Sequence, residues 1–282
     1  MEWFFPESME ELLTLLSEGE GLMLHGGGTM LIRLLRGGNT NVRGLVSLSK
    51  LSLDDVKVNG EDIEIGATNT FSSATSKINE LIIKNGKSQS SCLLCAAMGR
   101  AASTPIRNRM TIGGGVASLP PWSDIIASLY ILDAKIVIRG KNSGEYDFTE
   151  FYVNSKILLS NSVITSVRVP IKLLNRKFSY YRETRVSFDY PAFTIAVNAS
   201  IKNSIVNDIR ISVSGVKERV IRLSDIENFI SGENISIMKQ HGIAKDTSFN
   251  FGNKNAGGSE YLAHAARVEV ERSLHRIAES GD

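Results

Sequence analysis

The sequence has few cysteines, few prolines and no long apolar run. Two cysteines are too few for a disulfide framework, and only six prolines occur among the 282 residues. A membrane-spanning helix needs roughly 18 consecutive apolar residues, and no such stretch is found. The chain begins Met1-Glu2-Trp3 and shows neither the basic start nor the apolar run of a signal peptide. We therefore expect a cytoplasmic protein with no membrane partner.

An excess of charge of either sign is also missing. Lysine and arginine total 32, aspartate and glutamate total 30, and the formal net charge is +2. No window combines a basic patch with interleaved aromatic residues, so a nucleic-acid partner is not expected. Hydrophobic residues make up 42% and charged residues 22%, which is ordinary for a globular protein with a buried core. The length favours one large domain or two modest ones.

Periodicity predicts a mixture of helices and strands without a regular βαβ alternation, which favours the α+β class. Ser123 is expected to cap the helix that starts at Asp124, and Asn59-Gly60 is expected to form a hairpin turn. We place a domain boundary near Pro170, giving domains 1–170, with subdomains of about 1–50 and 51–170, and 171–282. The predicted helices are 7–18, 30–35, 92–102, 124–132 and 260–279, and the predicted strands are 45–48, 56–58, 63–65, 135–139, 163–169, 193–201 and 205–213. Residues 22–24 form a short apolar stretch that leads into the first glycine cluster.

Two glycine clusters, at residues 25–29 and 113–115, are the strongest local signals. Glycine lets backbone N–H groups approach an anionic or flat ligand, and consecutive N–H groups can form an anion nest. The alternative for each cluster is a tight turn with no ligand. Neither cluster matches the dinucleotide fingerprint G-x-G-x-x-G in a βαβ unit, and no phosphate-binding loop of the type G-x-x-x-x-G-K-[ST] occurs.

Other motifs carry no chemistry of their own. The string His25-Gly26-Gly27-Gly28 suggests an esterase oxyanion loop, but the G-x-S-x-G nucleophile motif that such an enzyme needs is absent. Cys92 and Cys95 have no second cysteine pair, and the alanine-rich setting favours two inert core thiols. The four histidines form no metal-binding pattern. We therefore expect no metal site on this chain.

Charged residues near the glycine clusters have both a functional and an ordinary interpretation. Arg107 and Arg109 precede the second cluster, where a guanidinium group would suit a phosphate, but solvated loop arginines are equally consistent with the pattern. Asp124 either stabilises a helix start or accepts hydrogen bonds from ligand hydroxyls. The residues alone leave these alternatives open.

Taken together, these motifs resemble the FAD-binding medium subunit of molybdenum hydroxylases, the flavoprotein chain of carbon-monoxide dehydrogenase and xanthine dehydrogenase. The resemblance covers nearly the whole chain. It is carried by Gly26-Gly27-Gly28-Thr29, Ile106-Arg107-Asn108, Thr111-Ile112-Gly113-Gly114, Ser123-Asp124, 164–170, 181–185 and Ser259-Glu260-Tyr261.

The resemblance implies a vanillyl-alcohol-oxidase-type FAD-binding fold of two α+β subdomains, followed by a smaller C-terminal α+β domain. It implies that the first glycine segment holds the diphosphate and that the second lies against the flavin nucleotide. The FAD-contacting positions that it implies are Leu24, His25, Gly26, Gly27, Gly28, Thr29, Met30, Leu31, Ala101, Thr111, Ile112, Gly113, Gly114, Gly115, Asp124, Ile164 and Arg182.

Three positions depart from the pattern of the family that the chain resembles. Gly115 stands where Asn or Asp is common, Met30 where an acid is frequent, and Arg182 where Lys is usual. The loss of a side chain at Gly115 could weaken FAD binding but leaves the backbone N–H groups in place. The cysteine-rich insertion of the iron–sulfur variant is absent, so no four-iron cluster is expected.

The resemblance implies an electron-transfer subunit with no catalytic acid, base or nucleophile of its own. A large partner would carry molybdopterin, a small partner would carry 2Fe-2S clusters, and FAD would pass electrons to NAD or another acceptor. The implied assembly is a duplicated complex of three chain types. Two alternatives stay open, namely a stand-alone flavin oxidoreductase of the same fold and a non-catalytic relative that has lost FAD.

Overall fold

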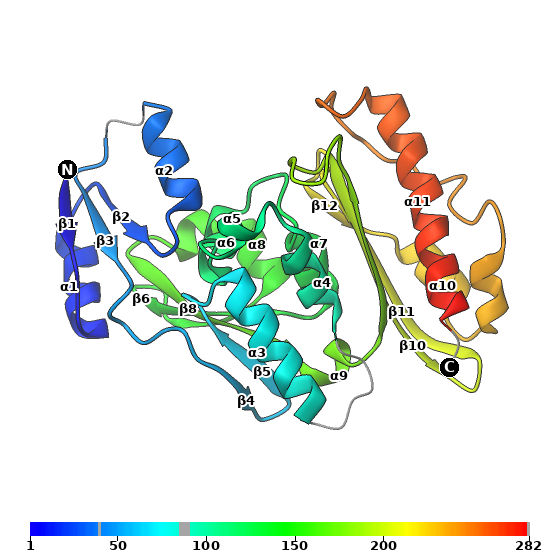
Figure 1. The fold of residues 1–282 in the computed structure, drawn as a ribbon, viewed down its shortest axis with the longest axis horizontal. Coiled ribbons are helices and arrows are strands. Elements are labelled where there is room, and N and C mark those ends of the chain that lie inside the picture. Colours follow the sequence, from blue (N-terminus) through cyan, green and yellow to red (C-terminus); the bar gives the residue numbers. More distant parts are fainter. Residues whose placement is uncertain (39–40, 85–90, 281–282) are drawn as a thin grey trace. The chain divides into compact units, whose positions relative to one another are not determined.

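The computed structural model describes residues 1–38, 41–84 and 91–280 (Figure 1). The chain forms two compact units. The first comprises Met1–Leu81, Ser103–Leu119 and Asp133–Pro170, and the second comprises Ile82–Ala102, Pro120–Leu132 and Ile171–Asp282. Helices and largely antiparallel sheets occur in both units, so the predicted α+β class is confirmed.

The first unit opens with a small parallel sheet in the order β1-β3-β2. Its elements are β1 (Glu2–Phe4), α1 (Met9–Glu18), β2 (Leu22–His25), α2 (Thr29–Arg36) and β3 (Gly44–Ser47). Helix α1 begins where the Ser8 side chain accepts a hydrogen bond from the Glu11 N–H, and it buries Leu12 and Leu16 in one cluster with Val46 of β3. This packing fixes the sheet from which the first glycine segment emerges.

A five-stranded antiparallel sheet forms the rest of the first unit, in the order β4-β5-β8-β6-β7. The predicted hairpin is confirmed, because Asn59 pairs with Asp62 and Gly60 adopts a φ of 62° in the turn. The strands are β4 (Val56–Asn59), β5 (Asp62–Gly66), β6 (Lys135–Gly140), β7 (Gly144–Asp147) and β8 (Ser162–Pro170), and the helices are α3 (Phe71–Lys84), whose last residues enter the second unit, α5 (Thr104–Arg107), α6 (Ile112–Ser118) and α8 (Phe148–Leu158).

The second unit is built on a four-stranded antiparallel sheet in the order β12-β11-β10-β9. The strands are β9 (Lys177–Glu183), β10 (Phe193–Lys202), β11 (Ile205–Ser214) and β12 (Val220–Arg222). The helices are α4 (Leu93–Arg100), α7 (Ile126–Ile131), α9 (Ile171–Leu174), α10 (Ser224–Ile230) and α11 (Ser259–Glu279), with a 3-10 helix, η1, at Ile235–Lys239.

Both faces of this sheet are covered. Figure 1 shows α11 along one side and α4 and α7 on the other. Ile195 and Val197 of β10 share a buried cluster with Leu274 of α11. On the α7 side, the Ser212 hydroxyl donates a hydrogen bond to the Ala127 carbonyl at 2.7 Å. Residues from the middle of the chain therefore complete the second unit, and the sequence boundary near Pro170 stays a prediction.

Candidate functional site

The first glycine segment links β2 to α2 in the first compact unit. Gly28 precedes the helix with a φ of 77°, a left-handed conformation that favours glycine, and no side chain caps the helix end. The first N–H groups of a helix have no partner inside the helix and carry a partial positive charge. Helix α2 begins at Thr29, directly after the glycine segment. The backbone N–H groups of its first turn are therefore available as hydrogen-bond donors, an arrangement that suits an anion.

The two predicted glycine segments lie against each other. A Cβ atom on Gly27 would fall 1.5 Å from the carbonyl oxygen of Arg109, and one on Gly26 would fall 2.9 Å from Oγ1 of Thr111. The Nε atom of Arg109 also donates to the Gly27 carbonyl at 3.4 Å. The prediction that these segments form one site is consistent with this contact, which joins positions about 80 residues apart in the chain.

The second glycine cluster is helical and not the loop that a nest or tight turn would form. Thr111 caps α6, because its Oγ1 accepts a hydrogen bond from the Gly114 N–H at 3.2 Å. A Cβ atom on Gly113 would lie 2.7 Å from that of Ala67, so this position needs glycine for close packing. Ile112 is fully buried at the start of the helix. The cluster thus opens a short helix that is held against the end of β5.

A histidine and an arginine set the charge around the first segment. Burial, followed by the positive charge of Arg109, lowers the pKa of His25 below its ordinary value of 6.5. The His25 ring also meets Trp3 edge to face, with 5.1 Å between the ring centroids. A neutral imidazole beside the exposed Arg109 guanidinium leaves a local positive charge at this segment.

Asp124 and Arg182 lie in the second unit and bind each other. The Arg182 Nε atom is 2.6 Å from Oδ1 of Asp124, and both side chains are 8% exposed. Burial raises the pKa of Asp124, while Arg182 and a hydrogen bond from Tyr180 act in the opposite direction. Tyr180 donates to Oδ1 of Asp124 at 2.9 Å and to the Asp124 carbonyl at 3.0 Å.

Two expectations about this segment need correction. The predicted cap at Ser123 is wrong, because α7 begins at Ile126 and its first turn has no side-chain cap. Asp124 turns towards Tyr180 and Arg182 instead of starting a helix. Tyr180 was missed as a partner, although Tyr180 and Arg182 stand two residues apart on β9 and therefore face the same way. That alternation was the signal that could have found it.

The remaining predicted positions are mostly buried. Ala101 follows α4 in the second unit, and Ile164 lies on β8 in the first, both in the core. Leu31 is buried, while Leu24, Thr29 and Met30 are partly exposed around the start of α2. The described residues thus bring Leu24–Leu31 and Thr111–Gly115 together in one unit, and Asp124 and Arg182 together in the other.

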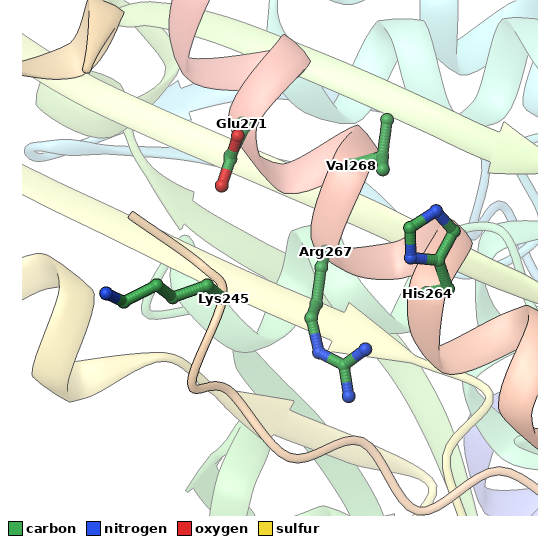
Figure 2. A pocket seen from close by; sticks show the side chains of 5 residues that line it. All are labelled: Lys245, His264, Arg267, Val268 and Glu271. Carbon is green, nitrogen blue, oxygen red and sulfur yellow. The ribbon is translucent and has the colours of Figure 1, made fainter. Parts of the chain in front are cut away.

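A cavity of about 270 Å³ lies beside α11 in the second unit and contains none of the predicted positions. It is lined by Lys245, His264, Arg267, Val268 and Glu271 (Figure 2). Two of these side chains are already engaged, because Arg267 donates to the Thr247 carbonyl and Glu271 accepts from the Ala244 N–H. Figure 2 shows Lys245 extending away from Arg267. The converging polar groups typical of a ligand site are therefore not formed here.

No metal-binding cluster of three or more His, Cys, Asp or Glu side chains is found within the described ranges. Cys92 and Cys95 are buried at the start of α4, and hydrogen bonding to Cys92, with burial, raises the pKa of Cys95 well above its usual range. Both are core thiols. None of the helices in residues 1–38, 41–84 and 91–280 is long and apolar enough to cross a membrane.

Two family models match the chain over nearly its whole length. Residues 1–172 match the FAD binding domain in molybdopterin dehydrogenase, and residues 178–277 match the CO dehydrogenase flavoprotein C-terminal domain. The chain belongs to this family. It is therefore the FAD-binding medium subunit of a molybdenum-dependent oxidoreductase, and FAD is the cofactor of its N-terminal domain.

Relatives of similar length support the assignment. The glyceraldehyde dehydrogenase medium chain of Sulfolobus acidocaldarius is 23% identical over 96% of each chain. The carbon monoxide dehydrogenase medium chain of Hydrogenophaga pseudoflava is 25% identical over 78% of this chain and 76% of the relative. Among solved structures, quinoline 2-oxidoreductase from Pseudomonas putida 86 superposes with a TM-score of 0.87 over 99% of this chain and 97% of that chain, at 19% identity. That likeness shows the medium-chain fold.

Proposed function

We propose that the chain holds the FAD diphosphate between residues Leu24–Leu31 and Thr111–Gly115. The observation that carries the proposal is the uncapped start of α2 behind Gly26–Gly28. The N–H groups of its first turn suit a diphosphate, because they have no partner within the helix and carry a partial positive charge. The contact of Gly27 with Arg109 supports a single site formed by both glycine segments, because it places Arg109 beside the first segment.

The other implied contacts are part of the same proposal. Ala101 and Ile164 are buried apolar residues, and we propose them only as packing beneath the flavin. Asp124 and Arg182 contribute as a pair, since each is the main partner of the other. Gly115 and Met30 belong to the same proposal, and at Gly115 only the backbone is available to the cofactor. We also propose the domain division 1–170 and 171–282 and a cytoplasmic location.

For the complex, we propose that this chain relays electrons between 2Fe-2S clusters on a small partner and NAD or another acceptor. A large molybdopterin-binding partner would oxidise the substrate. The support is that the relatives are named medium chains of dehydrogenases, which implies larger and smaller companions. When bound, FAD can take up and release electrons singly or in pairs, and the chain's own residues bind and orient it. We assign no catalytic acid or base to this chain.

The diphosphate site is tested by FAD titration of Arg109→Gln, with Arg36→Gln as the matched control. Both changes remove one exposed arginine from the first unit, but Arg109 touches the glycine segment and Arg36 lies at the opposite end of α2. Loss of one charge-assisted contact should weaken FAD binding about tenfold in the first variant and little in the second. Equal affinities in the two variants would move the diphosphate away from this segment.

The relay is tested by co-expression with chains encoded beside this one. A stable complex on size exclusion that reduces an acceptor in the presence of substrate supports the proposal. The isolated chain should turn over small organic substrates slowly while still accepting electrons from artificial donors. Turnover by the isolated chain at about 1 s⁻¹ or faster, typical of a complete enzyme, would favour a stand-alone flavin oxidoreductase instead.

A further inference from the structure

The segment between β9 and β10 carries an unusual set of exposed apolar side chains. Val186, Phe188 and Tyr190 are 65%, 69% and 57% exposed. Solvent-exposed apolar residues do not by themselves hold a loop in one conformation, because they gain little from packing. The backbone and the polar contacts of this segment are therefore the main candidates for holding it in place.

Arg182 makes the contacts that could fix it. Its Nη1 donates to the Ser187 carbonyl at 2.9 Å, and its Nη2 donates to the Asp189 carbonyl at 3.1 Å. Its Nε pairs with Oδ1 of Asp124 at 2.6 Å. One buried guanidinium group thus bridges a fixed carboxylate and two carbonyls of the segment.

The carboxylate is itself held by the scaffold of the second unit. Tyr180 donates to Asp124, and the Tyr180 carbonyl accepts a hydrogen bond from Nη1 of Arg100 on α4 at 2.8 Å. Burial and the charge of Asp124 keep the pKa of Tyr180 well above its usual range, so its hydroxyl stays a donor. The position of Arg182 is therefore set by α4, by Asp124 two residues before α7, and by β9.

Only arginine has the geometry for this role. Its planar guanidinium carries five N–H donors that point in different directions, whereas a lysine ammonium carries its donors on one atom. A lysine at this position could pair with Asp124, but it could not reach the carboxylate and both carbonyls at once.

We propose that Arg182 is a positioning residue that clamps residues 184–191 and that Asp124 orients it. Asp124 then affects cofactor binding through this segment, because its carboxylate is already occupied by Arg182 and Tyr180. The clamp itself follows from contacts within the second unit alone. Only its effect on FAD rests on the proposed function.

The chain contains a built-in reporter of the segment. Of its two tryptophans, Trp122 lies with its ring centroid 5.1 Å from that of Tyr190. The substitution Trp3→Phe leaves Trp122 as the single tryptophan. In that background its emission and its quenching by acrylamide follow the segment without any flavin present.

The deciding variant is Arg182→Lys. It keeps the positive charge beside Asp124 but removes the planar guanidinium group that reaches the two carbonyls. We expect acrylamide quenching of Trp122 to rise about twofold. The N–H of Asp189 donates to the Val186 carbonyl within the segment. Its hydrogen exchange should become at least about tenfold faster, because the variant loses the charge-assisted hydrogen bonds of Arg182. The amides of α11 should keep their wild-type exchange rates. Wild-type quenching and exchange at Asp189 in this variant would overturn the clamp.

Arg185→Lys is the matched control. Arg185 belongs to the same segment but is 56% exposed and pairs with the Asp189 side chain, so it should change the exchange rate less than about twofold. Should Arg182→Lys fail to fold, Asp124→Asn carries the test, because it keeps the shape and weakens the ion pair. It should accelerate the same amide, and an unchanged rate would again overturn the proposal. FAD affinity is measured last. If the wild-type chain does not bind FAD, the proposed cofactor site is refuted, but the quenching and exchange results still test the clamp.

Discussion

The carbonyl oxygen of Arg109 occupies the space that a side chain on Gly27 would fill. The distance from a Cβ atom built on Gly27 to that oxygen is 1.5 Å, which no backbone can accommodate without moving. Glycine at this position is therefore required by the protein's own packing. A loss of FAD in a Gly27 variant would not by itself show that Gly27 touches the cofactor.

Gly27→Ala should accordingly destabilise the protein in the absence of FAD. Forcing a methyl group into a closed contact costs about 2 kcal/mol or more. Thermal unfolding of the flavin-free protein measures the effect. Gly99→Ala on α4 is the control, because a Cβ there meets nothing within 4 Å, and we expect it to be neutral or mildly stabilising. Equal melting temperatures for the two variants would show that residues 26–28 move freely.

Local patterns predicted many of the elements, although helices α3 and α8 were missed, and they predicted the long-range contacts poorly. The hairpin at Gly60 follows from a two-residue turn signal, which depends on neighbouring residues only. The helical state of Gly113 follows from its approach to Ala67, 46 positions earlier in the chain, and no local rule contains that information. Glycine triplets usually indicate loops because glycine lowers helix propensity. Here the Thr111 cap and close packing prevail over that propensity.

The predicted site shows the same division. The resemblance implied that both glycine segments lie at the FAD, and the structure places them in contact through Arg109 and Thr111. The pairing of Asp124 with Arg182 could not be read from the sequence, because the residues are 58 positions apart. The placement of residues 120–132 in the second unit is likewise a tertiary fact. Sequence patterns give the type of residue at a site, and packing decides its partner.

FAD should bind noncovalently and stabilise the chain. A ligand at 100 times its dissociation constant adds about 2.7 kcal/mol to the free energy of unfolding, provided that the unfolded chain does not bind it. The melting temperature with and without FAD measures this, and acid denaturation should release all of the flavin. Riboflavin lacks the diphosphate and should stabilise far less. Equal stabilisation by both flavins would argue against the helix α2 site.

His25 should make stability depend on pH in a defined direction. Burial and Arg109 lower its pKa in the folded state below the ordinary value of 6.5. Between the folded and unfolded pKa values the unfolded chain binds more protons, so stability falls as the pH drops through 6.5. Denaturant titrations from pH 7.5 to pH 5 should show a smaller fall for His25→Gln. Arg109→Gln should reduce the fall in part, and an unchanged pH dependence in both variants would contradict the assignment.

A chain of charges across the five-stranded sheet should strengthen its middle strands. Arg168 on β8 pairs with Glu64 on β5 at 2.9 Å and with Glu145 on β7, which Lys135 also contacts at 3.0 Å. Burial raises the pKa of Glu64, but the Asn59 hydrogen bond and Arg168 outweigh it, and Lys135 and Arg168 lower that of Glu145. The stability that comes from these lowered carboxyl pKa values is present above about pH 4.5 and is lost as the pH falls through the folded pKa values.

Arg168→Met should therefore cost about 1 kcal/mol at neutral pH, and its difference from the wild type should shrink towards pH 3. Lys57→Met is the control, since its contact with Asp55 is 3.7 Å long and exposed, and it should leave the pH dependence of unfolding unchanged. A difference for Arg168→Met that stays constant from pH 7 to pH 3 would assign its effect to packing instead of charge.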